Sequence, residues 1–403
     1  MNVKIGMLLD AEFPPDIRVE NEMRTLAEAG NDVHLLCYDF AGKKSPLEKF
    51  TDRITIHRLR IYKQFHKKLN PLALILPFYF SYWSKHAFRF VEKYKLEVVH
   101  VHDLRLAEVG SRIKDRFHIP YILDLHENWP AGLKVYAFAN SIAGKLIISL
   151  KSWDHYERQQ ISKPDALITV IEEMKERIVN LGLNEEKIFV VPNYLNSGLF
   201  DSGKINAEIS KQPNEISLIY VGGFDAHRGL ETLVVAMKII QSNNDNIALH
   251  LIGSGSTEAK LKKIVQKKNI SKVIFHGWQQ DKKLPSYLST CDIGIVPHLK
   301  NSQTDYTIPH KLFQYMYYGK PVIVSNCRPL NRIITETKSG LIFESGNARE
   351  LATAIKKLAE NKKLRINMGQ RGRKAVINKY HWKIASRELF RLYEAIESTR
   401  SSE

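Results

Sequence analysis

Short apolar runs typical of strands alternate with amphipathic, helix-like segments along almost the whole chain, in two successive series. The first series ends near residue 191 and the second begins near residue 216. The segment between them, 196–215, is polar and contains Gly, Ser, Asn and Pro, so we interpret it as a linker. Buried strands that alternate with helices form parallel sheets with helices on both faces. The sequence therefore predicts an α/β fold with two doubly wound, Rossmann-like domains that face a central cleft.

The chain has 403 residues, which is long enough for two such domains. We expect an N-terminal domain over 1–195, the linker over 196–215, a C-terminal domain over 216–380 and a C-terminal helix over 381–403. The predicted strands are 3–9, 33–37, 54–59, 97–102, 120–125, 165–170, 187–191, 216–221, 247–252, 272–276, 292–296, 321–325 and 340–343. The predicted helices are 17–29, 71–93, 105–116, 141–162, 172–181, 229–241, 257–268, 282–289, 309–318, 347–360, 362–378 and 382–397. The C-terminal helices are expected to cross back to the first domain.

The loops that follow the strands of the second series are the expected binding region, because ligands of parallel α/β sheets bind beyond the carboxyl ends of the strands. Gly222 and Gly223 allow a ligand to approach the backbone, and Arg228 comes just before a helix. Paired glycines followed by a cation at a helix N-terminus suit a diphosphate group. Further candidates for the same site follow the next two strands: Gly253, Gly255, Trp278 and Gln279. Trp278 would form the wall of a nucleobase site or, alternatively, pack between the domains.

The segment IPHKLFQYMYYGKPVIVSN, residues 308–326, predicts a helix that begins at Pro309, ends at Gly319 and leads into a buried strand. This helix follows the strand 292–296, so its N-terminus is expected to point into the cleft that holds Arg228. Lys311 and Gln314 then lie where they would meet a phosphate or a ribose, since the amide both donates and accepts hydrogen bonds. Thr307, just before the helix, is assigned to the same site.

In the first series, two strands end in histidine and carboxylate. The motif HVHD (100–103) contains Asp103, and LDLHENWP (123–130) contains His126. Asp16 and Arg18 follow the first strand and are expected to face the same cleft. A metal site built from His102, Asp103, His126 and Glu127 is an alternative, but these residues lack the spacing of a strong ligand motif, and we predict no metal.

Several motifs in this order and spacing resemble one family, the retaining, nucleotide-sugar-dependent glycosyltransferases of the group 1 (family 4) type, which have the GT-B fold. They are FPPDIRVENEMRTLAEAGNDVHLL, VVHVHD, DLHE, VVPNYLN, YVGGFDAHRGLETLVVA, LIGSGS, IPHKLFQYMYYGKPVIVSN and SGLIFESGNARELATAI. The resemblance spans essentially the whole chain. It implies a donor bound mainly by the second domain, an acceptor bound mainly by the first, and a reaction without a required metal or other cofactor.

The resemblance also assigns individual residues. The family's Arg/Lys pair on the donor diphosphate corresponds to Gly223 and Arg228, so only the second cation is kept. Its two glutamates, which have seven residues between them, correspond to Tyr306 and Gln314, with Asp305 next to the first position. This departure leaves the ribose contact with Gln314 and removes the basis for assigning the donor sugar. The family's histidine near the donor sugar corresponds to His126.

We therefore predict a glycosyltransferase that moves a sugar from a UDP- or GDP-sugar to a glycan or lipid-linked acceptor with retention, in the biosynthesis of polysaccharides or cell-surface glycans. The expected catalytic residues are His126, Arg228 and Lys311, and the expected acceptor contacts are Asp16, Arg18 and Asp103. One alternative is a nucleotide-sugar epimerase of the same fold. Another is a non-catalytic sugar-nucleotide-binding partner subunit, which the missing glutamates would suit.

The chain carries a formal net charge of +17, and almost half of it lies within 58–95, where nine Lys/Arg face one acid and mix with aromatic and aliphatic residues. Such a segment suits an anionic membrane surface, although its apolar part would equally suit a core helix with a basic flank. No run approaches the roughly 18–20 apolar residues of a membrane span, and no nucleic-acid-binding module is present. The N-terminus predicts a strand and no signal peptide. Three isolated cysteines suit a reducing compartment, so we expect a cytoplasmic protein, peripheral on the inner face of the membrane.

Overall fold

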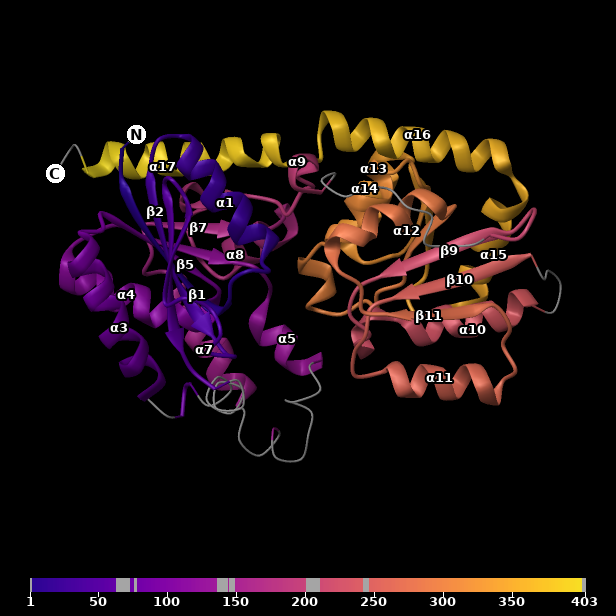
Figure 1. Cartoon of the computed structure of the whole chain (residues 1–403), viewed down its shortest axis with the longest axis horizontal. Coiled ribbons are helices and arrows are strands. Elements are labelled where there is room, and N and C mark those ends of the chain that lie inside the picture. Colours follow the sequence, from indigo (N-terminus) through magenta and orange to yellow (C-terminus); the bar gives the residue numbers. More distant parts are fainter. Residues whose placement is uncertain are drawn as a thin grey trace. The chain divides into compact units, whose positions relative to one another are not determined.

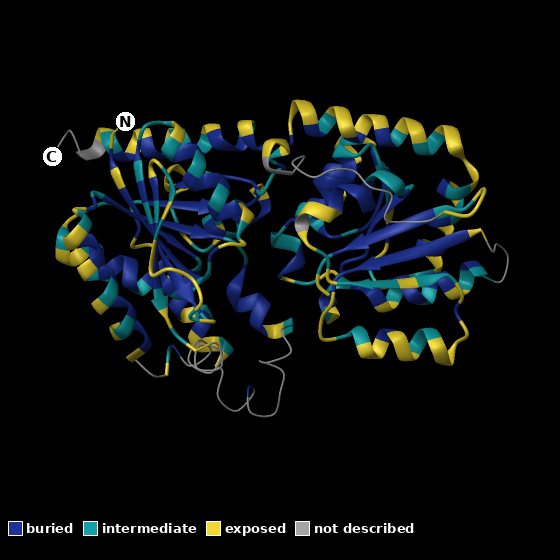
Figure 2. Cartoon of the chain, viewed as in Figure 1, coloured by how far each residue is buried: buried dark blue, intermediate teal, exposed yellow. Residues whose placement is uncertain are grey.

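A computed structural model describes residues 2–62, 73–75, 78–135, 144, 149–200, 211–241 and 246–400 (Figure 1). The chain divides into two compact units. The first combines Met1–Pro192 with Ala385–Glu403, and the second is Asn193–Ile384. Each unit has its own sheet, and the strands of both sheets are largely buried (Figure 2). The predicted α/β architecture with two doubly wound, parallel-sheet domains is confirmed.

The first unit contains an eight-stranded sheet with the order β3-β4-β2-β1-β5-β6-β7-β8. Its strands are β1 (Lys4–Glu12), β2 (Asp32–Asp39), β3 (Leu47–Thr51), β4 (Ile54–Arg60), β5 (Val98–His102), β6 (Tyr121–Leu125), β7 (Ala166–Thr169) and β8 (Ile188–Val190). All neighbouring strands are parallel except β3 and β4. The sequence did not predict β3. It is an edge strand without a buried residue, so it has no apolar run to identify it.

The helices of this unit follow the strands closely. They are α1 (Ile17–Glu28), α3 (Phe78–Tyr94), α4 (Ala107–Phe117), α5 (Trp129–Val135), α7 (Leu150–Gln160) and α8 (Glu172–Asn180), with short 3₁₀ turns at Leu104–Leu106 and Glu185–Lys187. Parts of the predicted helices 71–93 and 141–162 lie outside the described residues. The sequence did not predict α5, because its Pro130 and Gly132 are poor helix formers; its first five residues, 129–133, are buried.

Two alternatives were left open for the apolar part of segment 58–95, a membrane-binding surface and a core helix with a basic flank, and much of the described part is core. Tyr79, Phe80 and Trp83 on α3 are buried, whereas Ile75 and Phe78 are 52% and 45% exposed. The large aromatic rings pack inward because α3 covers the sheet, so the core-helix alternative holds for them. Lys63, Lys67 and Lys68 lie outside the described residues. No described helix is both long enough and apolar enough to cross a membrane.

The second unit contains a six-stranded parallel sheet with the order β11-β10-β9-β12-β13-β14. Its strands are β9 (Ile216–Val221), β10 (Ile247–Ile252), β11 (Val273–Gly277), β12 (Ile293–Val296), β13 (Val322–Ser325) and β14 (Gly340–Phe343). Its helices are α9 (Ser197–Phe200), α10 (Leu230–Gln241), α11 (Glu258–Lys267), α12 (Leu284–Thr290), α13 (His310–Tyr317), α14 (Arg328–Thr337), α15 (Ala348–Glu360) and α16 (Lys362–Asn378), with 3₁₀ turns at Ala226–Arg228, Asp281–Lys283 and Thr304–Tyr306. Every predicted strand of the second series is present.

The last helix, α17 (Trp382–Arg400), carries the chain from the second unit back to the first, which it joins at Ala385. Leu389, Leu392 and Tyr393 are buried, and the Tyr393 hydroxyl lies 3.0 Å from Nδ1 of His100 on β5. The expected return of the C-terminus is confirmed for α17, whereas α16 belongs to the second unit. The sequence did not predict α14, which starts with Arg328-Pro329 directly after a strand end.

Candidate functional site

Lys311 and Arg228 lie beside the loop after β9, neither has a carboxylate partner among the described residues, and Lys311 is the more buried of the two. It sits in the first turn of α13 and is 8% exposed. Its Nζ lies 4.0 Å from the centroid of the Tyr220 ring, which offers a π face and no charge. Within the described part of the chain, Nζ has no hydrogen bond or ion pair. Burial, and then the charge of Arg228, hold the pKa of Lys311 well below its ordinary value.

Arg228 is the second cation, at the end of the 3₁₀ turn that follows β9. Its Nη1 lies 3.3 Å from Nε2 of His298, and its buried Nε has no hydrogen-bond partner among the described residues. Burial, together with the charges of Arg228 and Lys311, holds the pKa of His298 well below its ordinary value. The ring is therefore neutral at pH 7. Lys311 and Arg228 together form a positive site that no described acid compensates.

Two glycines beside Lys311, Gly222 and Gly253, occupy positions where a side chain would not fit. Gly222 has φ +128°, and a Cβ there would lie 2.8 Å from Lys311 Nζ. Gly253 has φ +136°, and its Cβ would lie 2.0 Å from the Gly222 carbonyl oxygen. The loops after β9 and β10 therefore pack backbone to backbone beside the lysine. Gly255 lies against Phe224 in the same way, whereas a Cβ on Gly223 would meet only the Asp225 carboxylate, at 3.0 Å.

The remaining predicted donor residues lie on the neighbouring loops. Gln314 is 7% exposed on α13, one turn after Lys311. Thr307 donates to the Gln303 carbonyl at 3.2 Å, and Gln279 donates to the His276 carbonyl at 2.8 Å. Trp278 is 66% exposed directly after β11. The structure thus brings Gly222, Gly253, Arg228 and Lys311 into direct proximity, whereas Trp278 and Gln279 follow β11, Thr307 precedes α13 and Gln314 lies on it.

Asp305, next to the position of the missing first glutamate, has a structural partner. Its Oδ1 accepts a hydrogen bond from the backbone N–H of Arg328 at 2.8 Å, at the first residue of α14. The Arg328 guanidinium in turn lies over the Tyr306 ring, 5.7 Å from its centroid. The carboxylate therefore stabilises the start of a helix.

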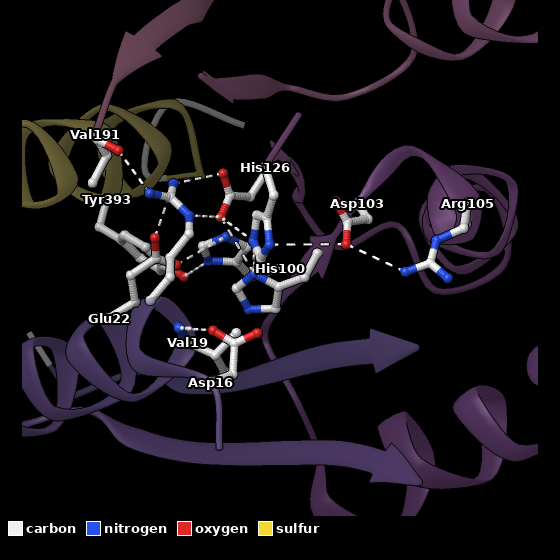
Figure 3. A network of polar contacts seen from close by, with 12 residues as sticks. Asp16, Val19, Glu22, His100, Asp103, Arg105, His126, Val191 and Tyr393 are labelled. Carbon is white, nitrogen blue, oxygen red and sulfur yellow. Dashed lines mark hydrogen bonds and ion pairs between the residues drawn. The ribbon is translucent and has the colours of Figure 1, made fainter. Parts of the chain in front are cut away.

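In the first unit, His126 and Asp103 form the accessible edge of a buried polar network (Figure 3). His126 Nε2 lies 3.0 Å from Asp124 Oδ2, and its Nδ1 lies 3.8 Å from Asp103 Oδ2. His102 Nδ1 lies 3.2 Å from the same Nε2. Although burial disfavours the charged ring, Asp103 and Asp124 raise the pKa of His126 to about 10. His126 is therefore an imidazolium at pH 7.

Arg18 is the buried cation of this network and fixes the position of Asp124. Its Nε and Nη2 donate to the two oxygens of Asp124 at 2.8 and 2.7 Å, and its Nη1 donates to the Val191 carbonyl at 2.7 Å. Burial disfavours the Asp124 carboxylate, but Arg18 and His126 hold its pKa well below the ordinary value. Arg18 is 3% exposed, so the expectation that it faces an open cleft was wrong. Arg18 stays buried because moving its guanidinium into solvent would leave the buried Asp124 carboxylate without its charge partner.

Asp16 and Asp103 keep positions near the network. Asp16 is the N-cap of α1, where its carboxylate accepts from the Val19 N–H at 3.1 Å. Asp103 follows β5 with φ +71° and lies 3.5 Å from Arg105, whose other terminal nitrogen is 3.0 Å from Asp10. Asp103 is partly exposed, so its free edge is available to a ligand.

Four fully buried side chains behind His126 offer ligand atoms within 4.8 Å of one another: Glu22, His100, His102 and Asp124. Arg18 lies 3.0 Å from Glu22 and 2.7 Å from Asp124, which puts a fixed cation beside both acids. A divalent ion would have to bind next to that guanidinium, so this set does not fit a metal. The four residues are also not the set His102, Asp103, His126 and Glu127.

Sequence reasoning missed His298, Tyr220, Asp124 and Glu22. A signal existed for two of them, since His298 follows the strand end IVPH and Asp124 precedes His126 in LDLHE. Tyr220 and Glu22 lie within a strand and a helix, where the sequence pattern marks them as ordinary core or surface positions.

Two family models match the chain. The model described as Glycosyl transferase 4-like domain matches residues 15–194, and the model described as Glycosyl transferases group 1 matches residues 201–375. Among curated relatives, the uncharacterized glycosyltransferase MJ1178 of Methanocaldococcus jannaschii is 24% identical over 382 residues, which covers 94% of each chain. The capsular polysaccharide biosynthesis glycosyltransferase CapM of Staphylococcus aureus is 26% identical over 240 residues, 56% of this chain and 60% of CapM.

The solved structure of Anabaena HepE in complex with UDP and glucose is similar in fold, with a TM-score of 0.71 at 13% identity over 98% of this chain and 100% of HepE. The two family models account between them for both units. The chain therefore belongs to the group 1 glycosyltransferases and has their GT-B fold.

Proposed function

We propose that this glycosyltransferase moves a sugar from a nucleoside-diphosphate donor to a hydroxyl of a glycan or lipid-linked acceptor, with retention at the anomeric carbon, in the biosynthesis of polysaccharides or cell-surface glycans. The observation that carries the proposal is the cation pair Arg228 and Lys311, which lacks a described acid partner and lies beside glycine backbone. UDP in the HepE structure and the capsular role named for CapM support the same reading.

In this proposal the diphosphate of a UDP- or GDP-sugar binds at Arg228 and Lys311. No side chain caps the N-terminus of α13, so the positive end of that helix adds to the attraction. Gly222, Gly223, Gly253 and Gly255 let the phosphates approach the backbone. Gln314 and Thr307 take the ribose side, and Trp278 and Gln279 take the base side.

The reaction breaks the bond between the anomeric carbon and the phosphate oxygen, so negative charge grows on the departing diphosphate. Arg228 and Lys311 stabilise that charge at the moment it appears, which is how fixed cations lower a barrier. The acceptor oxygen forms its bond to the anomeric carbon on the same face. Its proton passes to the leaving phosphate oxygen. This chemistry needs no resident metal or other cofactor.

The first unit is proposed to receive the acceptor. His126, as an imidazolium held at Nε2 by Asp124, directs its Nδ1–H toward Asp103 and toward sugar hydroxyls of the donor or acceptor. Asp103 and Asp16 supply acceptor contacts. Arg18 acts through Asp124, as a positioning residue.

The protein is further proposed to work at the cytoplasmic face of an anionic membrane, using the cations of 58–95. Lys85 is exposed on α3, and Ile75 and Phe78 near the start of that helix are exposed apolar side chains. Each basic residue near an anionic surface contributes about 1 kcal/mol, so a few suffice for reversible binding.

A thermal-shift panel of UDP-, GDP-, ADP- and TDP-sugars tests the donor proposal, because a ligand that binds only the native state raises the melting temperature. Wild type should be stabilised by one nucleotide series and Arg228→Ala should not. Stabilisation by no nucleotide sugar would contradict the proposal. Formation of an epimer of the donor sugar without acceptor would indicate the epimerase, and donor binding without transfer to any acceptor would indicate the non-catalytic subunit.

A further inference from the structure

Helix α16 carries an unusual concentration of unpaired positive charge. Its 17 residues, KKLRINMGQRGRKAVIN, include six Lys/Arg and no acid. Arg365 donates to the Leu358 and Ala359 carbonyls at the end of α15. Five others have neither an ion pair nor a hydrogen bond within the ranges the structure describes, and all are exposed: Lys362, Lys363, Arg371, Arg373 and Lys374.

The inward face of α16 is built from small residues. Gly369 lies so close to the Gly319 carbonyl that a Cβ would stand 1.9 Å from its oxygen, and Gly372 packs against Met316 and Ser339. Val376 completes the buried stripe at 1% exposure. These three residues, with the partly buried Leu364 and Met368, fix α16 on the second unit and leave an exposed outer face (Figure 2).

Two isoleucines interrupt the charged surface of this helix. Ile366 is 48% exposed and Ile377 is 51% exposed. They are 11 residues apart, which at 100° per residue is about three full turns and puts them on one line along the helix. On the same count Lys362, Lys363, Arg373 and Lys374 all fall within about 80° of that line. Exposed aliphatic side chains between cations are typical of a helix that lies on anionic lipid.

A pocket of about 380 Å³ continues this line at the C-terminal end of α16. Its lining combines apolar and basic side chains and contains no acid: Leu195, Asn196, Ser197, Tyr317, Arg373, Val376, Ile377, His381, Trp382 and Lys383. Arg373 and Ile377 belong both to the pocket and to the exposed line. An amphipathic hollow of this kind matches a phosphate group with its adjoining glycerol and acyl carbons.

We propose that the α16 surface, formed by Lys362, Lys363, Ile366, Arg373, Lys374, Ile377 and the adjoining pocket, binds anionic phospholipid in a membrane surface. The cations attract the headgroups, the pocket receives a lipid phosphate at Arg373 and Lys383, and the two isoleucines enter the boundary of the acyl chains. A nucleic acid would use the cations but has no use for aliphatic side chains at this spacing. The proposal does not rest on the proposed reaction or on 58–95.

Vesicle flotation of the full chain tests the surface, with phosphatidylcholine vesicles that contain or lack phosphatidylglycerol. Wild type should float with the anionic vesicles only. Ile366→Ser/Ile377→Ser leaves the net charge unchanged and should lower the partition coefficient about tenfold, since the lost burial is apolar. Arg373→Gln/Lys374→Gln should also lower it.

A matched control is Lys263→Gln/Lys267→Gln on α11, where two exposed lysines likewise have no ion pair or hydrogen bond within the described residues and the isoleucine between them, Ile264, is only partly exposed. This pair should lower binding less than Arg373→Gln/Lys374→Gln, although the charge change is the same. A Lys85→Ser/Arg89→Ser variant reports separately on α3. Equal loss in the α11 and α16 charge variants, unchanged flotation of the isoleucine variant, or retention of wild type in the unbound fraction would each overturn the proposal. An oligonucleotide that binds the protein in the absence of lipid and displaces it from the vesicles would also overturn the proposal.

Discussion

Arg228 Nη1 lies 3.3 Å from His298 Nε2, and the ring nitrogen is the acceptor because a guanidinium has no acceptor atom. Cations inside proteins are usually held by carboxylates, which cancel their charge. Here the holder is neutral, since burial and the nearby cations keep the pKa of His298 well below its ordinary value. Arg228 is thereby fixed in place while its full charge remains available to an anion.

This relationship predicts opposite behaviour of two isosteric variants. His298→Asn keeps a neutral acceptor and should retain UDP or GDP affinity within about threefold of wild type, whereas His298→Asp places a carboxylate against Arg228 and should weaken it by tenfold or more, about 1.4 kcal/mol. Calorimetry with the nucleoside diphosphate measures both. Equal losses in the two variants would assign His298 a packing role only.

Arg228 itself should contribute strongly to donor binding. Arg228→Ala should lose roughly 2–4 kcal/mol of donor affinity, because a buried contact between an arginine and a phosphate is charge-assisted and can be bidentate. Arg228→Lys keeps the charge without the planar fork and should fall between the two. Unchanged donor binding by calorimetry in the alanine variant would contradict the diphosphate assignment.

Lys311 predicts proton uptake when the diphosphate binds. Burial and Arg228 hold its pKa well below the ordinary value in the free protein, and an anion beside Nζ would raise it again. Between those two pKa values binding takes up a proton, so affinity falls as pH rises through that interval. In a series of titrations from about pH 7 to about pH 10, two buffers of different ionisation enthalpy should give different apparent enthalpies within that interval, and Lys311→Met should remove most of the difference. Identical enthalpies for wild type in both buffers across the whole series would show that diphosphate binding does not change the protonation of Lys311.

The contrast between Arg228 and Arg18 shows what a sequence of this kind can predict. Strand period and the carboxyl-end rule placed Arg228, His126 and Asp103 in loops after strands, and the helix-start pattern placed Lys311 at the beginning of a helix, because these features depend on neighbours within a few residues. These sequence patterns could not show which arginine is paired with a carboxylate and which is not. Arg18 meets Asp124 across 106 residues of sequence, and Arg228 meets His298 across 70. Such partners are decided by which strands lie side by side, so only the fold shows them.

His126 should affect turnover and leave nucleotide binding nearly intact. It lies in the first unit, whereas Arg228, Lys311 and the glycine loops all belong to the second. His126→Ala should therefore lower turnover by about 10²-fold or more if the imidazolium orients a reacting sugar, with nucleoside diphosphate affinity within about twofold of wild type. Parallel loss of affinity and turnover would instead assign the histidine to the nucleotide site or to the fold.

The same histidine makes a prediction about stability against pH. Burial alone would lower its pKa, but Asp103 and Asp124 raise the pKa of His126 to about 10, above the roughly 6.5 of an unfolded chain. A raised folded-state pKa gives stability that is fully present below about pH 6.5 and lost as pH rises toward about 10. At about 1.4 kcal/mol per pH unit, the upper bound of this loss is about 5 kcal/mol.

The melting temperature of wild type should therefore fall over that pH interval faster than that of His126→Gln, whose neutral amide cannot titrate. Glu22→Gln is the matched control, because it removes the buried carboxyl whose pKa burial raises to about 8 and keeps His126. Parallel melting curves of wild type and His126→Gln from pH 6.5 to 10 would show that His126 is neutral in the folded protein.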